Sequence, residues 1–331
     1  MKERADPRGE PAQELREGVV MRATAGSLLV RSDGETWLCR VRGRLKRGDR
    51  REQMVAVVGD RVAFRDLGRS GDEDSPRGII EDVRPRRSRI SRRSGRRTGG
   101  HTEQVLMANL DQVVAVQSVT EPDPQSGFVD RLLVSAERDK LPGVLCLNKV
   151  DRDPAAAADP RWDYYAGLGY EVLRTSAATG EGCEELARRL VDRLSLLLGA
   201  SGVGKSSLLN RVEPGLGLRV TEVARTGLGR HTTTRTELFP LSAGGFIADS
   251  PGMRGFDLWD IDPASLADYF PDFREPAADC RFRTCLHRDE PGCGVKEAVA
   301  RGAIPDWRHG AYLDLLSDVV KHAGGIPGRR V

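Results

Sequence analysis

The spacing of apolar positions changes near residue 105, and the segment before it predicts a small β-barrel. Apolar stretches of strand length alternate there with turn residues, at positions 18–23, 27–31, 35–41, 55–64 and 78–83. Short strands separated by Gly, Asp and Ser are typical of barrels and sandwiches. We expect an OB-type barrel, a fold that commonly presents a nucleic-acid-binding face. The pattern alone leaves an SH3-like barrel open.

Beyond residue 105, strands and helices alternate, which predicts a doubly wound α/β domain with its ligand loops at the carboxyl ends of the strands. Apolar strands are expected at 112–116, 143–147, 171–174 and 194–198, and helices at 128–138, 161–170 and 182–192. The last helix runs into the strand at 194–198 without Gly, Pro or Asn between them. Either the connection at that point is tight or the strand is short.

These patterns predict a multidomain chain. We expect a disordered leader over 1–16, the barrel over 17–84, an arginine-rich linker over 85–102, the α/β domain over 103–260 and a helical, metal-binding domain over 261–331. In the last domain helices are expected at 295–301 and 307–320. Leu313, Leu316 and Val320 share one helix face, which favours a core over a partner groove.

Composition limits the class of protein. A chain of 331 residues with 39% hydrophobic residues can bury more than one core, and a net charge of +3 makes any nucleic-acid footprint local. The polar first residues do not resemble a secretion signal, and apolar runs stay well below the roughly 18 residues of a membrane span. We expect a soluble, cytoplasmic protein.

The segment 84–97 holds eight arginines in fourteen residues and no acid. One interpretation is a solvated linker. The other is an arm that contacts RNA phosphates between two folded domains, in which case binding would be sensitive to salt.

A glycine-rich segment follows the strand at 194–198 and fits G-x-x-x-x-G-K-[ST], the phosphate-binding loop. Its glycines let backbone N–H groups face phosphate oxygens, Lys205 adds a positive charge, and the Ser206 hydroxyl can ligate Mg²⁺. Ser207 continues into a helix whose N-terminus faces the anion. The alternative is a glycine-rich turn without a ligand. The candidate residues are Gly199, Ala200, Ser201, Gly202, Val203, Gly204, Lys205, Ser206 and Ser207.

A guanine-recognition motif of the form N-K-x-D ends the strand at 143–147, as Asn148, Lys149, Val150 and Asp151. The Asp151 carboxylate can accept both N–H groups of the guanine edge, which adenine lacks, so an ATP-using enzyme is disfavoured. Asn148 can bond the purine and the Lys149 stem can lie across the base. Ser176 and Ala177 complete the set about twenty-five residues later.

Two further segments predict the remaining contacts. The strand at 246–249 delivers Asp249 for Mg²⁺, and Gly252 offers a backbone N–H to the γ-phosphate. Between them, the segment 229–234 carries Thr232, Thr233 and Thr234, one of which could ligate Mg²⁺. Thr233 is the candidate adopted, although the sequence does not choose among them. A Ser/Thr-rich surface loop is the alternative.

Near the C-terminus, three cysteines and a histidine within fourteen residues predict a structural metal site. The spacing Cys280-x4-Cys285-x-His287-x5-Cys293 suits a closed tetrahedral Cys₃His set, typical of zinc. Free thiols beside a surface histidine are the alternative. Cys39, Cys146 and Cys183 are scattered, and we expect them to be packing residues.

The order of these motifs is unusual, because base recognition precedes phosphate recognition. That order fits a circularly permuted GTPase. Together with the barrel and the cysteine cluster, the motifs resemble the RsgA/YjeQ family of small ribosomal subunit biogenesis GTPases over about residues 18–320. The resemblance implies an OB-fold, a permuted GTPase and a zinc domain that act together on the 30S subunit and its 16S rRNA. It also implies GTP hydrolysis late in maturation, stimulated by the 30S particle and coupled to release. We expect a monomer.

The residue after the D-x-x-G motif is Met253, which cannot orient a water as glutamine does. The resemblance implies that His231 is the catalytic residue instead. Met253 also keeps a second hypothesis open, in which the protein is an RNA-binding assembly factor that senses guanine nucleotide with negligible turnover. Phosphate release with and without 30S particles separates the two.

Overall fold

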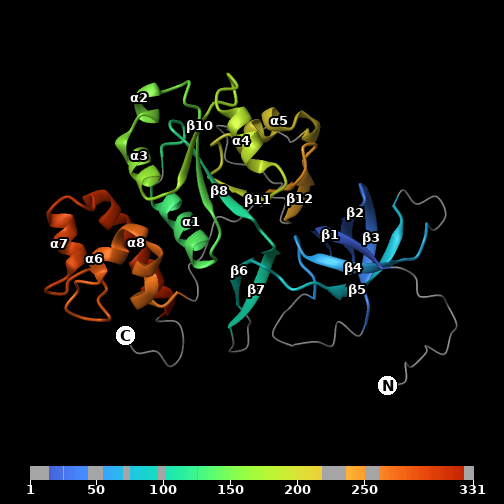
Figure 1. Ribbon diagram of the computed structural model, residues 1–331, viewed down its shortest axis with the longest axis horizontal. Helices are drawn as coiled ribbons and strands as arrows, with labels where there is room; N and C mark the ends of the chain where they lie inside the picture. Colours follow the sequence, from blue (N-terminus) through green and yellow to red (C-terminus); the bar gives the residue numbers. More distant parts are fainter. Residues whose placement is uncertain are drawn as a thin grey trace. The chain divides into compact units, whose positions relative to one another are not determined.

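The computed structural model describes residues 15–24, 26–43, 55–69, 75–95, 101–124, 126–217, 236–249 and 261–323. The chain divides into two compact units, residues 1–109 with 235–238 and residues 110–234 with 239–331 (Figure 1). Within the described ranges, the helices are all too short or too polar to cross a membrane. Of the leader expected over 1–16, only Leu15 and Arg16 are described, and Arg16 already begins a strand.

The first unit is a closed five-stranded barrel. Its strands are β1 (Arg16–Ala23), β2 (Leu28–Ser32), β3 (Glu35–Val41), β4 (Arg61–Asp66) and β5 (Arg77–Val83). They pair in the order β1-β2-β3-β5-β4, and β4 closes on β1. The β3–β5 pair is parallel and the other pairs are antiparallel. The strand order, with β3 beside β5 and β4 closing on β1, fits the expected OB-type barrel rather than the SH3-like alternative.

The fourth strand begins later than its apolar pattern predicts, at Arg61 instead of residue 55. A turn occupies the preceding residues because buried Asp60 accepts a hydrogen bond from the Val57 N–H at 2.7 Å. Arg86 neutralises the same carboxylate through contacts of 2.8 and 2.9 Å. The buried, paired Asp60 therefore sets the start of β4, which apolar spacing does not reveal.

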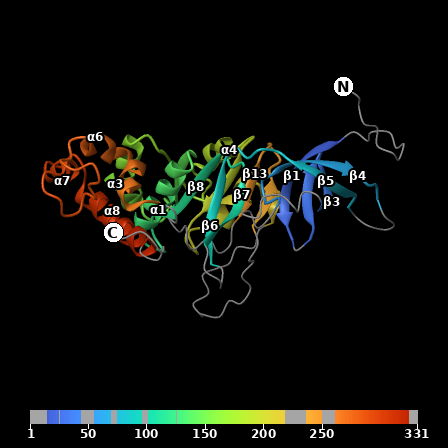
Figure 2. The same cartoon turned by 90° about the horizontal axis from the view of Figure 1, so that it is seen from below.

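The arginine-rich stretch contains a strand where a linker was expected. β6 (Arg89–Gly95) pairs antiparallel with β7 (His101–Ala108), and the two lie side by side in Figures 1 and 2. The register runs from Arg89 opposite Ala108 to Gly95 opposite His101. The sequence of β6 is rich in Arg and Ser and carries little apolar signal, so backbone pairing, not apolar spacing, defines this hairpin.

The second unit is built on a parallel sheet of five strands in the order β10-β9-β8-β11-β13. All residues of the central strand β8 are buried, as expected for a sheet covered on both faces. The chain runs outward from β8 to β10, returns to β11 on the other side, and so creates a switch point between β8 and β11. The strands are β8 (Gln112–Ser118), β9 (Gly143–Asn148), β10 (Glu171–Thr175), β11 (Leu194–Leu198) and β13 (Phe246–Asp249).

Helices pack against this sheet. α4 and α5 share a buried cluster with β8, β9 and β11, whereas α1 packs against β8 and β9 and also meets α8 (Figure 1). A short strand, β12 (Glu237–Pro240), leads into β13 through a turn closed by the Leu241 N–H and the Gly245 carbonyl at 3.1 Å. The helices are α1 (Ser126–Arg138), α2 (Pro154–Ala157), α3 (Pro160–Gly167), α4 (Cys183–Leu190) and α5 (Lys205–Val212), with a 3₁₀ turn at Pro214–Leu216.

The C-terminal part of this unit is helical. Phe270, Phe273 and Tyr312 are fully buried in its core, and Leu316 joins them at 1% exposure. Leu313 and Val320 pack against the same core, which confirms that the apolar stripe is not a partner groove. The elements are 3₁₀ turns at Pro263–Tyr269 and Pro271–Phe273, then α6 (Arg274–Ala277), α7 (Gly294–Ala300) and α8 (Asp306–Ala323).

A buried ion cluster joins this helical part to the α/β sheet. Arg308 at the start of α8 is 1% exposed and pairs with Asp130 of α1 and with Asp272, the latter at 2.9 Å. The hydroxyl of Tyr165 donates to Asp130 at 2.7 Å, and that of Tyr164 donates to Asp272 at 3.0 Å. The helical part is thus anchored to α1 and α3 by paired buried charges.

Candidate nucleotide and metal sites

The phosphate loop lies at the switch point, between the end of β11 and the start of α5. Gly204 caps α5 with φ +94°, and Gly202 has φ +83°, conformations that favour glycine. A Cβ on Gly204 would lie 2.3 Å from Nδ2 of Asn148, so this glycine also permits a close approach to the guanine motif. Val203 between them is fully buried and anchors the loop in the core.

Lys205 lies folded against its own loop. Its Nζ donates to the carbonyls of Gly199 at 2.8 Å and Ala200 at 3.0 Å. The ammonium is therefore held at the loop, where the sequence places the charge for the β- and γ-phosphates.

Asn148 connects three loops at the carboxyl edge of the sheet. It is 1% exposed, and its Nδ2 donates to the carbonyl of Val203 in the phosphate loop at 2.8 Å. Its Oδ1 accepts the N–H of Ala177 at 3.2 Å. The side chain thus fastens the ends of β9, β10 and β11 together, which brings the predicted base and phosphate motifs into one site.

Lys149 and Asp151 sit on the open side of this junction. Lys149 has φ +65°, a left-handed conformation that is costly outside glycine and that clusters at functional sites. Its Nζ donates to the carbonyl of Glu121, and Arg152 pairs with the Glu121 carboxylate at 2.8 Å. Burial and the nearby Arg152 charge lower the pKa of Lys149. Asp151 is exposed, so its carboxylate is accessible to a ligand.

Ser176 forms the turn that presents Ala177. It is fully buried, its Oγ accepts the N–H of Thr179 at 3.1 Å, and its carbonyl accepts the N–H of Gly180 at 2.8 Å. Glu121 belongs to the same edge, but sequence reasoning missed it. It follows β8 without a recognisable motif, and its contacts with Lys149 and Arg152 reveal it.

For several predicted site residues, the structure does not describe the side chain or the residue itself. The backbone of Asp249 ends β13 in register with Leu197, two residues before the phosphate loop, but its side chain is not described. His231, Thr232, Thr233, Thr234, Gly252 and Met253 lie in the segments 218–235 and 250–260, outside the described residues.

The predicted cysteine and histidine cluster forms a compact group. The ligand atoms of Cys280, Cys285, His287 and Cys293 lie within 4.8 Å of one another. Sγ of Cys280 is 3.8 Å from Sγ of Cys293, and His287 Nδ1 is 3.5 and 3.4 Å from these two sulfurs. Tetrahedral zinc, with Zn–S near 2.3 Å and Zn–N near 2.05 Å, requires S–S spacings of about 3.8 Å and S–N spacings of about 3.5 Å. The donor set therefore fits such an ion.

The cluster is held by groups around it. Glu290 accepts the backbone N–H groups of Leu286 at 2.9 Å, Arg288 at 3.0 Å and Asp289 at 3.1 Å. Partial burial would raise the pKa of Glu290, but these N–H groups outweigh it and lower the pKa to about 2. Sequence reasoning missed Glu290. The signal that could have found it is an acidic residue between two predicted metal ligands, His287 and Cys293.

The imidazole and the free cysteines also fit their expected roles. Burial lowers the pKa of His287, which favours the neutral form that binds metal. His309 Nε2 lies 2.8 Å from the carbonyl of His287. Cys39, Cys146 and Cys183 are buried and outside the cluster, as predicted for packing residues.

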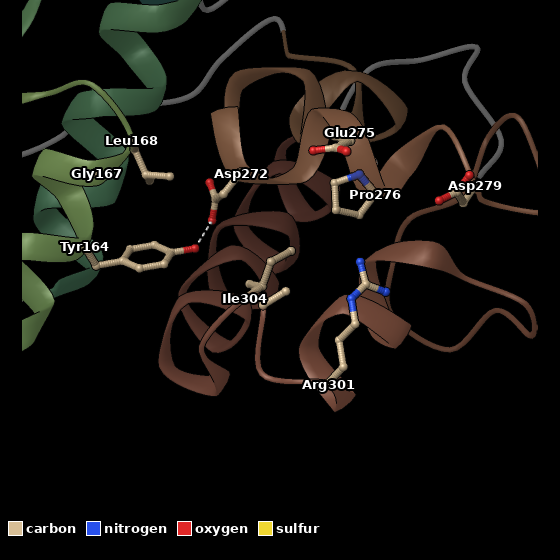
Figure 3. A pocket seen from close by; sticks show the side chains of 10 residues that line it. Tyr164, Gly167, Leu168, Asp272, Glu275, Pro276, Asp279, Arg301 and Ile304 are labelled. Carbon is tan, nitrogen blue, oxygen red and sulfur yellow. Dashed lines mark hydrogen bonds between the residues drawn. The ribbon is translucent and has the colours of Figure 1, made fainter.

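A separate pocket of about 420 Å³ lies between α3 and the helical part (Figure 3). Tyr164 and Leu168 line one side, and Asp272, Glu275 and Arg301 line the other. None of the predicted nucleotide or metal residues lines it. The predicted nucleotide site is therefore distinct from this pocket.

A parallel sheet with a phosphate loop at its switch point and a guanine motif earlier in the chain defines a circularly permuted GTPase. The comparisons with known proteins agree. The family model for the RsgA GTPase matches residues 83–259, and the model for the RsgA N-terminal domain matches residues 17–72. The chain belongs to the RsgA GTPase family, and it is a GTP hydrolase by that membership.

Individual relatives cover nearly the whole chain. A protein of Moorella thermoacetica is 40% identical over 92% of this chain and 97% of its own, and one of Gemmatimonas aurantiaca is 41% identical with the same coverage. Both carry the name small ribosomal subunit biogenesis GTPase RsgA. The structure of YjeQ from Thermotoga maritima is 34% identical, with a TM-score of 0.71 over 96% of this chain and 100% of its own. YloQ, described as a circularly permuted GTPase, has a TM-score of 0.69 at 26% identity over 97% and 100%.

These findings confirm the predicted family and the predicted architecture of barrel, permuted GTPase and helical part with a cluster that could hold a metal. Guanine nucleotide with Mg²⁺ follows from the GTPase family. The roles of individual site residues remain predictions.

Proposed function

We propose that this protein binds the 30S ribosomal subunit through its 16S rRNA and assists late maturation, with GTP hydrolysis stimulated by the particle and coupled to release. The observation that carries the ribosomal part is the name shared by relatives that align over more than nine-tenths of the chain. The bond between Asn148 and the Val203 carbonyl supports the nucleotide part, because it joins guanine and phosphate recognition.

In this proposal the base is read by Asp151, with Asn148 and Lys149 beside it, and the phosphates lie on the loop from Gly199 to Ser207. Ser206, Asp249 and Thr233 hold Mg²⁺, and Gly252 donates to the γ-phosphate. The described members of this set converge on the carboxyl edge of the sheet, which supports the assignment.

Zinc is the metal we assign to Cys280, Cys285, His287 and Cys293. The support is the donor set and its spacing, which suit a closed structural site. A Cys285→Ser variant is expected to purify without stoichiometric zinc, and full retention by elemental analysis would refute the assignment. We further propose a monomeric, cytoplasmic protein with domain boundaries near residues 17, 85 and 261.

The test of the main proposal is phosphate release by the purified protein with and without 30S particles. A rise in GTP turnover with 30S, absent with 50S particles, is expected. The second candidate, an RNA-binding sensor with negligible turnover, is favoured by Met253 in place of glutamine. It predicts nucleotide-dependent 30S binding at a turnover that the particle does not change.

His231 is the residue we assign to catalysis. His231→Ala should keep GTP affinity and 30S binding while losing stimulated turnover. Met253→Ala, in the segment after the D-x-x-G motif, is the control, and it should retain turnover. Unchanged turnover in His231→Ala would remove the histidine from the reaction.

A further inference from the structure

The loop between the first two metal-ligating cysteines has an unusual surface composition. Cys280 and Cys285 enclose Arg281, Phe282, Arg283 and Thr284, and all four of these residues are exposed. The Phe282 side chain is 43% exposed, whereas Phe270 and Phe273 of the same helical part are fully buried. Of the three large exposed apolar side chains in the described ranges, Phe282 is the aromatic one. Its exposure means that the core does not require it.

The loop has a defined conformation. The Cys285 N–H donates to the Phe282 carbonyl at 3.2 Å, and the Arg281 N–H donates to the Gly292 carbonyl at 2.9 Å. Gly292 has φ +64°, and a Cβ built on it would lie 3.4 Å from Cβ of Arg281. The Arg281 stem therefore lies over the Gly292 backbone, and the two metal-ligating cysteines fix the ends of the loop.

The charges around the ring favour an anion. Cζ of Arg281 lies 5.6 Å from the centroid of the Phe282 ring. Within the described part of the chain, neither Arg281 nor Arg283 has a carboxylate partner, while Arg288 nearby is paired with Asp289 at 2.7 Å. The nearest acid along the chain before the loop is Asp279, on the other side of Cys280.

An exposed aromatic ring between two arginines suits single-stranded nucleic acid. A base can stack on the ring, which every base can do through its π-face, and guanidinium groups can contact the flanking phosphates. Double-stranded RNA hides its base faces, so unpaired nucleotides are the fitting partner. An acidic peptide would satisfy the arginines but would make less use of the ring.

We infer that the loop 281–284 binds an unpaired RNA nucleotide, with its base stacked on Phe282 and its phosphates on Arg281 and Arg283. The inference rests on the proposed function, since it assigns this contact to the ribosomal RNA of the 30S particle. The metal then has a role beyond folding, because it holds the stacking ring at a defined position.

The test compares the affinity of full-length, zinc-loaded variants for purified 30S particles in the presence of a non-hydrolysable GTP analogue. Phe282→Ala should weaken binding by roughly 5- to 150-fold, the range for loss of one stacked base. Phe282→Leu keeps apolar surface but has no π-face, so it should lose nearly as much affinity. Phe282→Trp should bind as tightly as the wild type. Equal affinity of the Phe, Leu and Ala proteins would overturn the inference.

Charge is tested with Arg281→Ala and Arg283→Ala, against Arg301→Ala as an exposed arginine of the same helical part. The loop variants should reduce both the affinity and its dependence on salt, whereas Arg301→Ala should change neither. Equal losses in all three would indicate a general charge effect and contradict the loop assignment. Zinc content and melting temperature should match the wild type, which separates lost contacts from lost folding.

The partner class is tested with a photoreactive benzoyl-phenylalanine at position 282. A crosslink to a nucleotide of 16S rRNA supports the inference, and a crosslink to a ribosomal protein overturns it. If the wild-type protein does not bind 30S particles at all, the proposed function fails. If it binds and the Phe282 variants bind equally, only this inference fails.

Discussion

At the scale of single residues, Asn148 organises the nucleotide site. Its side chain is buried, donates to Val203 and accepts from Ala177, so the amide satisfies groups from two other loops. Leaving such buried groups unpaired costs about 1–3 kcal/mol each. The motif predicted that Asn148 contacts the base. That contact stays a prediction, and the structure adds that Asn148 also links the segment of Lys149 and Asp151 to the phosphate loop.

Asp151 should determine which base is accepted. Asp151→Asn replaces one acceptor with a donor, so GTP affinity should fall by roughly 10- to 100-fold, as expected for lost hydrogen bonds to a charged group. Xanthosine triphosphate, which has a carbonyl where guanine has its amino group, should gain affinity. Binding of both nucleotides by calorimetry measures this. Asp153→Asn, which preserves the side-chain cap of α2, is the control and should leave both affinities unchanged.

Glu290 should control how firmly the cluster holds its metal. Glu290→Gln keeps the size of the side chain but removes the charge that accepts three backbone N–H groups. Loss of such outer contacts typically costs 10- to 100-fold in metal affinity, so transfer of zinc to a chromophoric chelator should speed up by about tenfold or more. Asp289→Asn, an exposed acid paired with Arg288, should transfer zinc at the wild-type rate.

At the scale of elements, the connection from α4 to β11 shows how a turn can form without a turn residue. Asp192 adopts φ +54°, and a Cβ on Gly244 would lie 2.2 Å from its Oδ1. Aspartate tolerates the left-handed region better than most residues. Of the two alternatives, a tight connection or a short strand, the structure shows the tight connection, since β11 has its full expected length from Leu194 to Leu198 and Asp192 forms the turn. The neighbouring Gly244 allows the close approach, which no local pattern indicates.

The entry into α5 should be intolerant of a side chain. Gly204→Ala forces φ +94° on alanine and places Cβ 2.3 Å from Asn148 Nδ2. Stability should fall by about 1–3 kcal/mol from strain, and GTP affinity should fall by at least about tenfold as Asn148 is displaced. Gly169→Ala is matched at φ +92° with open space around it. Gly169→Ala should lower the free energy of unfolding in urea while its GTP affinity stays unchanged. A similar loss of GTP affinity in both variants would contradict the role of the Gly204–Asn148 approach.

At the scale of the whole second unit, the helical part is joined to the sheet by the cluster of Arg308, Asp130 and Asp272. Asp130 and Arg308 are 178 positions apart in the chain, and both are nearly inaccessible to solvent. Buried ion pairs contribute little net stability compared with apolar packing, but breaking one is expensive. The cluster therefore specifies where the helical part docks.

Arg308→Leu should destabilise this unit strongly, by about 3–5 kcal/mol, because it leaves two buried carboxylates without their cation. Arg274→Leu removes a largely exposed partner of Glu137 and should cost no more than about 1 kcal/mol. Chemical unfolding followed by circular dichroism compares them.

The loss of stability caused by Arg308→Leu should depend on pH. Burial raises the pKa of Asp130, and the Arg308 guanidinium lowers it. Without the arginine, the folded state takes up a proton at a higher pH than the unfolded state does, so the variant should regain stability as pH falls from 7 towards 5. A deficit that is constant across this range would show that lost packing, not charge, causes it.

The sequence alone determined the class of this protein, because the residues that bind its ligands form short motifs with fixed spacings. The order of Asn148–Asp151 before Gly199–Ser206 identified the permuted GTPase, and the spacing from Cys280 to Cys293 identified a cluster that could hold a metal. Alternating apolar positions located the barrel strands and most of the sheet. These motifs can be recognised from the sequence because the residues of each one lie within a single turn, strand or loop.

Only the tertiary structure decided what joins these parts. The bond from Asn148 to Val203 spans 55 positions, and the hairpin of β6 and β7 depends on backbone pairing rather than on apolar spacing. The docking of the helical part depends on the buried ion pair between Arg308 and Asp130. Such contacts form between segments distant in the chain, and their energy depends on burial and on partners that a linear pattern does not contain.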